Sequence, residues 1–201
     1  MANISAVDVK KLRDLTGAGM MDCKDALVET GGDFDAAVER LREKGLASAA
    51  KRAGRSANQG LVEAYIHFNN TVGVLVEVNC ETDFVANTAE FKTLAKDIAL
   101  HIASPSAPRF VTRDEVPADE IEHERQIFAK QAAESGKPEN VIDRIVEGKL
   151  DAYFKDVVLL DQPFVKDDSM TIQQLLDQTS VKVKEKVAVR RFVRYKLGEE
   201  D

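Results

Sequence analysis

The feature that most constrains the fold of this chain is a strict two-residue alternation over residues 61–80. Every second residue of its later half is apolar: Val72, Val74, Val76, Val78 and Cys80. The earlier half alternates in the same way: Val62, Ala64, Ile66 and Phe68. Asn69 and Asn70 separate the two halves, and asparagine tolerates the left-handed backbone of a tight turn. The pattern therefore predicts a β-hairpin.

A third alternating run, residues 187–195, predicts a further strand near the carboxyl end of the chain. Because two strands alone are marginal in water, we expect this strand to pair with the hairpin in a three-stranded antiparallel sheet. Elsewhere the apolar residues recur at helical spacing. Strands and helices are not interleaved regularly, so the expected fold class is α+β, with helices packed on the sheet.

The first 46 residues read as three short helices joined by glycine-containing turns. Val7, Leu12 and Leu15 are expected to form one buried face, and Val28 belongs to the apolar set of the second helix. Gly45 is expected to end the third helix. Residues 47–59 are rich in Ala, Gly and Ser and predict a linker, and residues 60–201 then form the core domain.

Within the core domain, residues 119–133 and 139–154 read as two charged helices with a short connection. A short connection makes neighbouring helices antiparallel. We therefore expect a helical hairpin over residues 118–156 that projects from the body of the domain.

Charge and targeting signals narrow the class of protein. The net charge of −7 argues against bulk attraction to nucleic acid or anionic lipid, so neither partner is expected. No apolar run is long enough to cross a bilayer, and the first residues show no secretory or transit pattern. We expect a cytoplasmic protein, with bacterial and organellar origins both open, and two reduced, buried cysteines, Cys23 and Cys80.

The sequence gives little support for catalysis. Its three histidines, His67, His101 and His123, lie on three different expected elements, without metal-ligand spacing, so no metal site is expected. The segment "TGAGMMDCK" lacks the pattern of a phosphate-binding loop. Neither cysteine has the setting of a nucleophile. We expect no cofactor and no enzyme activity.

Two places on the chain favour protein contact instead. Met20 and Met21 are adjacent, and one helix cannot bury both, so one is expected at the surface. In "VNCETDFVAN", Phe84 stands where the expected strand meets a helix, beside Thr82 and Asp83. Periodicity alone favours an inward Phe84 that plugs the junction. The polar flanks, and a helix cap at Asn87, favour an outward Phe84 that anchors a partner.

Several segments together resemble the elongation factor Ts family, over nearly the whole chain. They are "LRDLTGAGMMDCKDAL", "AAKRAGR", "VNCETDFVAN", "SGKPENVIDRIVEGKL" and "DQPFVKD". The resemblance implies a guanine-nucleotide exchange factor that binds elongation factor Tu with GDP, disturbs its magnesium and phosphate site, and promotes GDP release during translation elongation. It also implies that the three amino-terminal helices form a ubiquitin-associated (UBA)-like bundle.

The resemblance implies residue roles as well. Asp83 and Phe84 would intrude beside the magnesium and phosphates of the partner, with Thr82 and Val85 flanking them. The remaining positions that match partner contacts are Met20, Met21, Lys24, Arg52 and His101. The chain has one hairpin-plus-helix unit where long family members have two, so it resembles the short form and is expected to be a homodimer. The alternative is a non-catalytic binding adaptor that uses the bundle and the helical hairpin.

Overall fold

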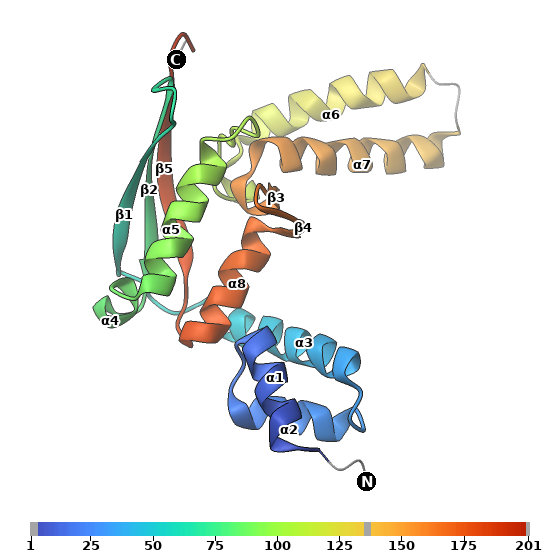
Figure 1. Cartoon of the computed structure of the whole chain (residues 1–201). Helices are drawn as coiled ribbons and strands as arrows, with labels where there is room; N and C mark the ends of the chain where they lie inside the picture. The colour runs from blue at the N-terminus through green and yellow to red at the C-terminus, as the bar shows by residue number, and fades with distance from the viewer. Residues whose placement is uncertain (1–3, 135–137, 200–201) are drawn as a thin grey trace. The chain divides into compact units, whose positions relative to one another are not determined.

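The structure, a computed structural model, describes residues 4–134 and 138–199 (Figure 1). It is an α+β fold with amino-terminal helices and a three-stranded antiparallel sheet, which confirms the predicted class. The elements are α1 (Ala6–Thr16), α2 (Met20–Glu29), α3 (Phe34–Arg52), β1 (Gln59–Ile66), β2 (Val72–Cys80), α4 (Asp83–Ala86), α5 (Ala89–Ile102), η1 (Arg113–Glu115), α6 (Ala118–Ala133), α7 (Glu139–Val157), η2 (Leu159–Asp161), β3 (Pro163–Phe164), β4 (Asp167–Thr171), α8 (Ile172–Val183) and β5 (Ala188–Lys196).

The chain divides into two compact units, each assembled from three separate stretches. The described residues of 1–60, 79–91 and 176–188 form the first unit, and those of 61–78, 92–175 and 189–201 form the second. The domain boundaries expected from the sequence, at residues 46 and 59, stay a prediction.

The first unit begins with the α1–α3 bundle. Ser5 and Asp8 form a reciprocal capping box that starts α1, and Gly17, with φ of 67°, ends it. The bundle buries one small core: Val9, Leu12, Ala18, Cys23, Ala26, Leu27, Ala37 and Leu41. Each of the three helices thus contributes a narrow apolar stripe to a common core.

The apolar faces expected on α1 and α2 were partly wrong. Val7, Leu15 and Val28 are exposed. The buried stripe of α1 passes through Val9 and Leu12 instead, which turns Val7 and Leu15 to water. The bundle therefore carries apolar side chains on its outer surface.

The helix end predicted at Gly45 was also wrong, because α3 continues to Arg52. The segment after Gly45 is rich in alanine, the best helix former, which offsets the cost of a glycine inside a helix. A Cβ at Gly45 would lie 3.2 Å from Cγ2 of Val181. Gly45 therefore permits close packing of α3 on α8, and α3 extends through residues 47–52 of the expected linker.

The second unit contains most of the sheet, whose strand order is β1-β2-β5. The predicted hairpin is confirmed: His67 N donates to Val72 O at 2.9 Å, and Asn70 has the expected positive φ, 57°. Alternate residues of β2 are buried, as predicted. The alternation of β5 shifts, however, since Arg190 and Arg191 are both exposed and Phe192 and Arg194 are less exposed than their neighbours.

The helical hairpin is confirmed as α6 packed against α7, and Figure 1 shows the pair extending away from the rest of the second unit. Ala132, Val146 and Leu150 form its buried seam. Arg125 on α6 pairs with Glu147 on α7 at 2.5 Å. No helix in the described residues is both long and apolar enough to span a bilayer.

Candidate partner-binding site

The candidate site is centred on the turn that follows β2, which belongs wholly to the first unit. Thr82 has an extended backbone, and its hydroxyl accepts a hydrogen bond from Val85 N at 3.4 Å. This N-cap starts α4, a single helical turn of four residues. The loop expected between strand and helix is therefore a capped helical turn.

Phe84 points into solvent from this turn, with 83% of its surface exposed. Ala86 is the buried residue of α4 and faces inward. The alternative in which Phe84 plugs the junction is therefore wrong, because the much smaller Ala86 takes that place. Asp83 is exposed beside Phe84, and Val85 is half-buried.

The helix cap expected at Asn87 lies one residue further on. Thr88 Oγ accepts from Phe91 N at 3.2 Å and so caps α5. Asn87 instead ends α4, and its side-chain amide donates to Asp83 O at 2.9 Å. The chain thus passes from α4 to α5 within two residues. The caps on both helices hold the backbone of the turn that carries Phe84.

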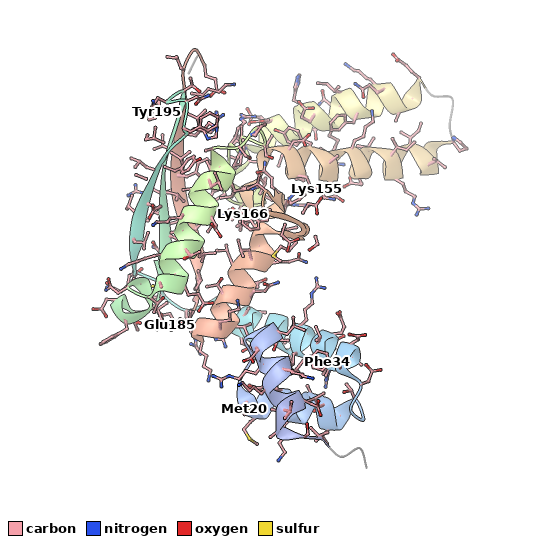
Figure 2. The ribbon with its side chains drawn as sticks, in the orientation of Figure 1. Met20, Phe34, Lys155, Lys166, Glu185 and Tyr195 are labelled. Carbon is pink, nitrogen blue, oxygen red and sulfur yellow. The ribbon has the colours of Figure 1, made fainter. Side chains whose placement is uncertain are left out.

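Carboxylates from both sides hold the start of the turn. Glu185, labelled in Figure 2, accepts from Thr82 N at 3.0 Å. Glu81 accepts from Lys186 N at 2.6 Å, and Arg55 pairs with Glu81 at 3.2 Å. The Lys186 N–H, together with Arg55, holds the pKa of Glu81 below its ordinary value although partial burial opposes the shift.

Sequence reasoning missed Glu185 as part of the site. It lies 103 residues from Thr82 along the chain. Nothing in a single sequence pairs a glutamate in a helix–strand connection with a turn that far away. Only the fold brings them together.

The predicted contact residues on α2 are at the surface. Met20 and Met21 are 46% and 64% exposed, so both are exposed where only one was expected, and Met20 is labelled in Figure 2. Lys24 is exposed on the same helix. Val28 lies seven residues after Met21, two helical turns along the same face, and extends this surface.

Arg52, at the end of α3, is half-buried and engaged within the chain. Its guanidinium donates to Ser48 Oγ at 2.8 Å and lies 3.5 Å from Ser180 Oγ. It therefore secures α3 against α8, with part of its surface left for a partner. Arg52, α2 and the Phe84 turn all belong to the first unit.

The structure places His101 elsewhere, in the second unit and fully buried. Val165 N donates to its Nδ1 at 3.2 Å, so Nε2 carries the proton and donates to Gln162 Oε1 at 2.9 Å. Burial lowers the pKa of the imidazole below 6.5, and the bond to Gln162 opposes this shift. A side chain without exposed surface cannot contact a docked protein, so His101 is excluded from the proposed interface.

The two cysteines are buried and form no disulfide, as expected. Burial raises the pKa of both thiols. Within residues 4–134 and 138–199, no three His, Cys, Asp or Glu side chains gather in a way that could hold a metal ion. The candidate site consists of the turn that exposes Phe84 and the face of α2 that exposes Met20 and Met21, and exposed large apolar side chains of this kind are features of a protein-binding surface.

Comparison with known proteins agrees with this geometry. A sequence model described as elongation factor TS matches residues 7–199. The chain belongs to the elongation factor Ts family.

Curated relatives match it over nearly its full length. It is 57% identical to elongation factor Ts of Desulforamulus reducens over 199 residues, covering 99% of this chain and 91% of the relative. It is 55% identical over 196 residues to that of Fervidobacterium nodosum, covering 98% of this chain and 99% of the relative. It is 53% identical over 197 residues to that of Geobacter metallireducens, covering 98% and 91%. Elongation factors Ts act in translation elongation as nucleotide-exchange factors.

Proposed function

We propose that this protein binds elongation factor Tu in its GDP form and promotes GDP release by disturbing the magnesium and phosphate site of that GTPase. The observation that carries the proposal is Phe84, an aromatic side chain 83% exposed on a capped, hydrogen-bonded turn. Large apolar side chains are normally buried, and an exposed aromatic on a rigid support is typical of an interface anchor.

The thermodynamic basis is linkage. An exchange factor that binds the empty GTPase more tightly than the GDP-bound GTPase must weaken GDP binding by the same factor. Phe84 supplies the differential contact, because its pocket opens only when the magnesium site of the partner is distorted. Burying such a side chain contributes about 2 kcal/mol.

Asp83 adds an electrostatic contribution beside Phe84. Its carboxylate is exposed on the same turn. Brought near the phosphates of bound GDP, a carboxylate repels them and competes for the metal that neutralises them. Thr82 and Val85 hold this pair, through the N-cap bond between them. No bond is made or broken in this chain, which therefore needs no cofactor and is not an enzyme.

The amino-terminal bundle, which we propose is UBA-like, provides a second contact. Met20, Met21 and Lys24 are exposed at the start of α2, and Val28 continues the surface. Flexible methionines adapt to a partner surface, and a lysine at the edge adds charge complementarity. Arg52 adds a basic contact from the end of α3.

We also propose a homodimer, formed through the outer face of the sheet. Leu197 N donates to Thr71 O at 2.8 Å and His67 N donates to Val72 O, which aligns β5 and β1 on either side of β2. Exposed apolar side chains then share one face of the sheet: Val62, Ile66, Phe68, Leu75, Val193, Tyr195 and Leu197. Tyr195 is labelled in Figure 2. A patch of this kind marks an interaction surface.

The test is a stopped-flow measurement of fluorescent GDP release from elongation factor Tu, with and without this protein. The proposal expects release to accelerate with protein concentration and to saturate. Because the mechanism acts through the metal site, excess magnesium should reduce the acceleration. A binding adaptor, the alternative from the sequence, would bind elongation factor Tu without changing the release rate.

A further inference from the structure

Three chain segments meet at the base of the Phe84 turn, all within the first unit. They are the end of α3, the residues that follow β2, and the α8–β5 connection. Glu185 of that connection makes three hydrogen bonds to the turn. Its Oε2 accepts from Glu81 N at 3.1 Å and Thr82 N at 3.0 Å, and its Oε1 accepts from Thr82 Oγ at 2.7 Å. Both carboxylate oxygens of Glu185 thus accept hydrogen bonds from two consecutive residues, Glu81 and Thr82.

These bonds fix the hydroxyl of Thr82 as well as its backbone. The hydroxyl donates its proton to Glu185, so its lone pairs remain for Val85 N. A continuous series of hydrogen bonds therefore runs from Glu185 through Thr82 to Val85. Phe84 lies between the last two residues, so its backbone is held on both sides.

A reciprocal set of bonds fixes Glu185 itself. Glu81 accepts from Lys186 N at 2.6 Å, and the ammonium of Lys186 donates to Ala53 O at 2.6 Å and Arg55 O at 3.0 Å. Ser180 Oγ donates to Glu185 O at 2.6 Å. The connection is therefore tied to α3 and α8, and through Glu185 it holds the turn.

We propose that Glu185 is a positioning residue for nucleotide exchange, which holds the Thr82–Val85 turn so that Phe84 is presented before the partner docks. This inference rests on the proposed function and deepens it. A turn that became ordered only on binding would use part of the binding free energy to do so. Less would then remain to distort the nucleotide site of the partner, and release would slow.

The experiment compares Glu185→Ala and Glu185→Gln with the unchanged protein, each at saturating concentration, in fluorescent GDP release from the partner GTPase. Glu185→Ala should slow release about tenfold, equivalent to about 1.4 kcal/mol. Glu185→Gln should stay within about threefold of the unchanged protein, because the amide oxygen still accepts both N–H groups and the NH₂ can donate to the Thr82 hydroxyl.

Glu115→Ala is the matched control. Glu115 also accepts a backbone N–H, that of Val111 at 2.9 Å, but it lies in the second unit. Losing a glutamate of this kind can lower stability, whereas only Glu185→Ala should slow exchange. Equal rates for Glu185→Ala, Glu115→Ala and the unchanged protein would overturn the inference.

A double-mutant cycle shows whether Glu185 acts through Phe84. If it does, Glu185→Ala combined with Phe84→Ala is no slower than Phe84→Ala alone, because there is no aromatic ring left to position. If the two effects multiply, Glu185 acts elsewhere and the inference is wrong. Should Glu185→Ala fail to fold, Thr82→Val removes one of the same hydrogen bonds, and an unchanged rate for that variant would overturn the inference.

A spectroscopic readout separates order in the turn from activity. The chain has no tryptophan. Phe84→Trp therefore places a single reporter on the turn, and Glu185→Ala in that background should speed its fluorescence depolarisation, whereas Glu115→Ala should not. If the unchanged protein fails to accelerate GDP release, the proposed function fails. If it accelerates release and Glu185→Ala neither slows release nor loosens the reporter, the positioning role alone fails.

Discussion

Single residues divide into those that the fold uses internally and those that it leaves for a partner. His101 and Phe84 illustrate the two cases. Both stand near an end of a predicted helix and both were candidates for contact. His101 is fully buried, and both of its ring nitrogens are hydrogen-bonded. Phe84, in contrast, is 83% exposed. Burial therefore separates these two candidates, although both were expected at helix ends.

The pH dependence of stability tests the role of His101. Its folded-state pKa lies below 6.5, because burial disfavours the charged form. The stability that depends on neutral His101 is therefore complete above pH 6.5 and is lost as pH falls through the folded-state pKa. Urea unfolding from pH 7.5 to pH 5 should show this loss, and His101→Gln should reduce it.

His123→Gln, which changes an exposed histidine on α6, is the control and should keep the original pH dependence. GDP release measured at pH 7.5 should be unaffected by His101→Gln. If a folded His101→Gln protein lost most of its exchange activity, His101 would have to be a contact residue after all.

Individual elements were predicted well where packing follows periodicity. The β1–β2 hairpin and the α6–α7 pair were both expected, with ends close to those observed. Gly45 was misread because a lone sequence cannot tell a glycine that ends a helix from one that admits Val181. Of the site, the exposed Phe84 and Met21 came from local pattern and resemblance. Glu185 could not, because its contact is made only by the folded chain.

The α2 surface gives a prediction at the scale of one element. If α2 contributes to docking and Phe84 to release, changing α2 should affect affinity only. Val28→Lys should raise the concentration for half-maximal exchange about tenfold, or about 1.4 kcal/mol, and leave the maximal rate unchanged. Lysine near a helix carboxyl end favours the helix, so the fold should persist.

Val165→Lys is the matched control, because Val165 is also exposed but lies in the second unit. Val165→Lys should leave both the concentration for half-maximal exchange and the maximal exchange rate unchanged. A lower maximal rate for Val28→Lys, with unchanged half-maximal concentration, would contradict the division of roles between α2 and the Phe84 turn.

At the scale of the whole molecule, the two units present different surfaces. The first carries the Phe84 turn and α2, and the second carries the apolar sheet face. If the sheet face pairs two copies of the chain, one dimer presents two Phe84 turns. Partner binding and dimer formation should then be separable by mutation.

Sedimentation velocity tests the dimer directly. Leu75→Lys places a charge in the middle of the sheet face, and a two-fold interface would bury that charge twice. The unchanged protein should sediment as a dimer at micromolar concentration and Leu75→Lys as a monomer. Val165 and Leu75 are both 49% exposed, so Val165→Lys is again the control. A monomer for the unchanged protein would refute the dimer.

The central claim, that Phe84 is kept outside its own fold for a pocket in the GTPase, is tested most directly by Phe84→Ala. Val165→Ala is the matched control, because Val165 is 49% exposed and lies outside both the turn and the sheet face. Both variants should melt within a few degrees of the unchanged protein, since neither side chain is buried. Only Phe84→Ala should slow GDP release from elongation factor Tu, by about tenfold or more. A Phe84→Ala protein that releases GDP as fast as Val165→Ala, or that loses its fold, would contradict the account.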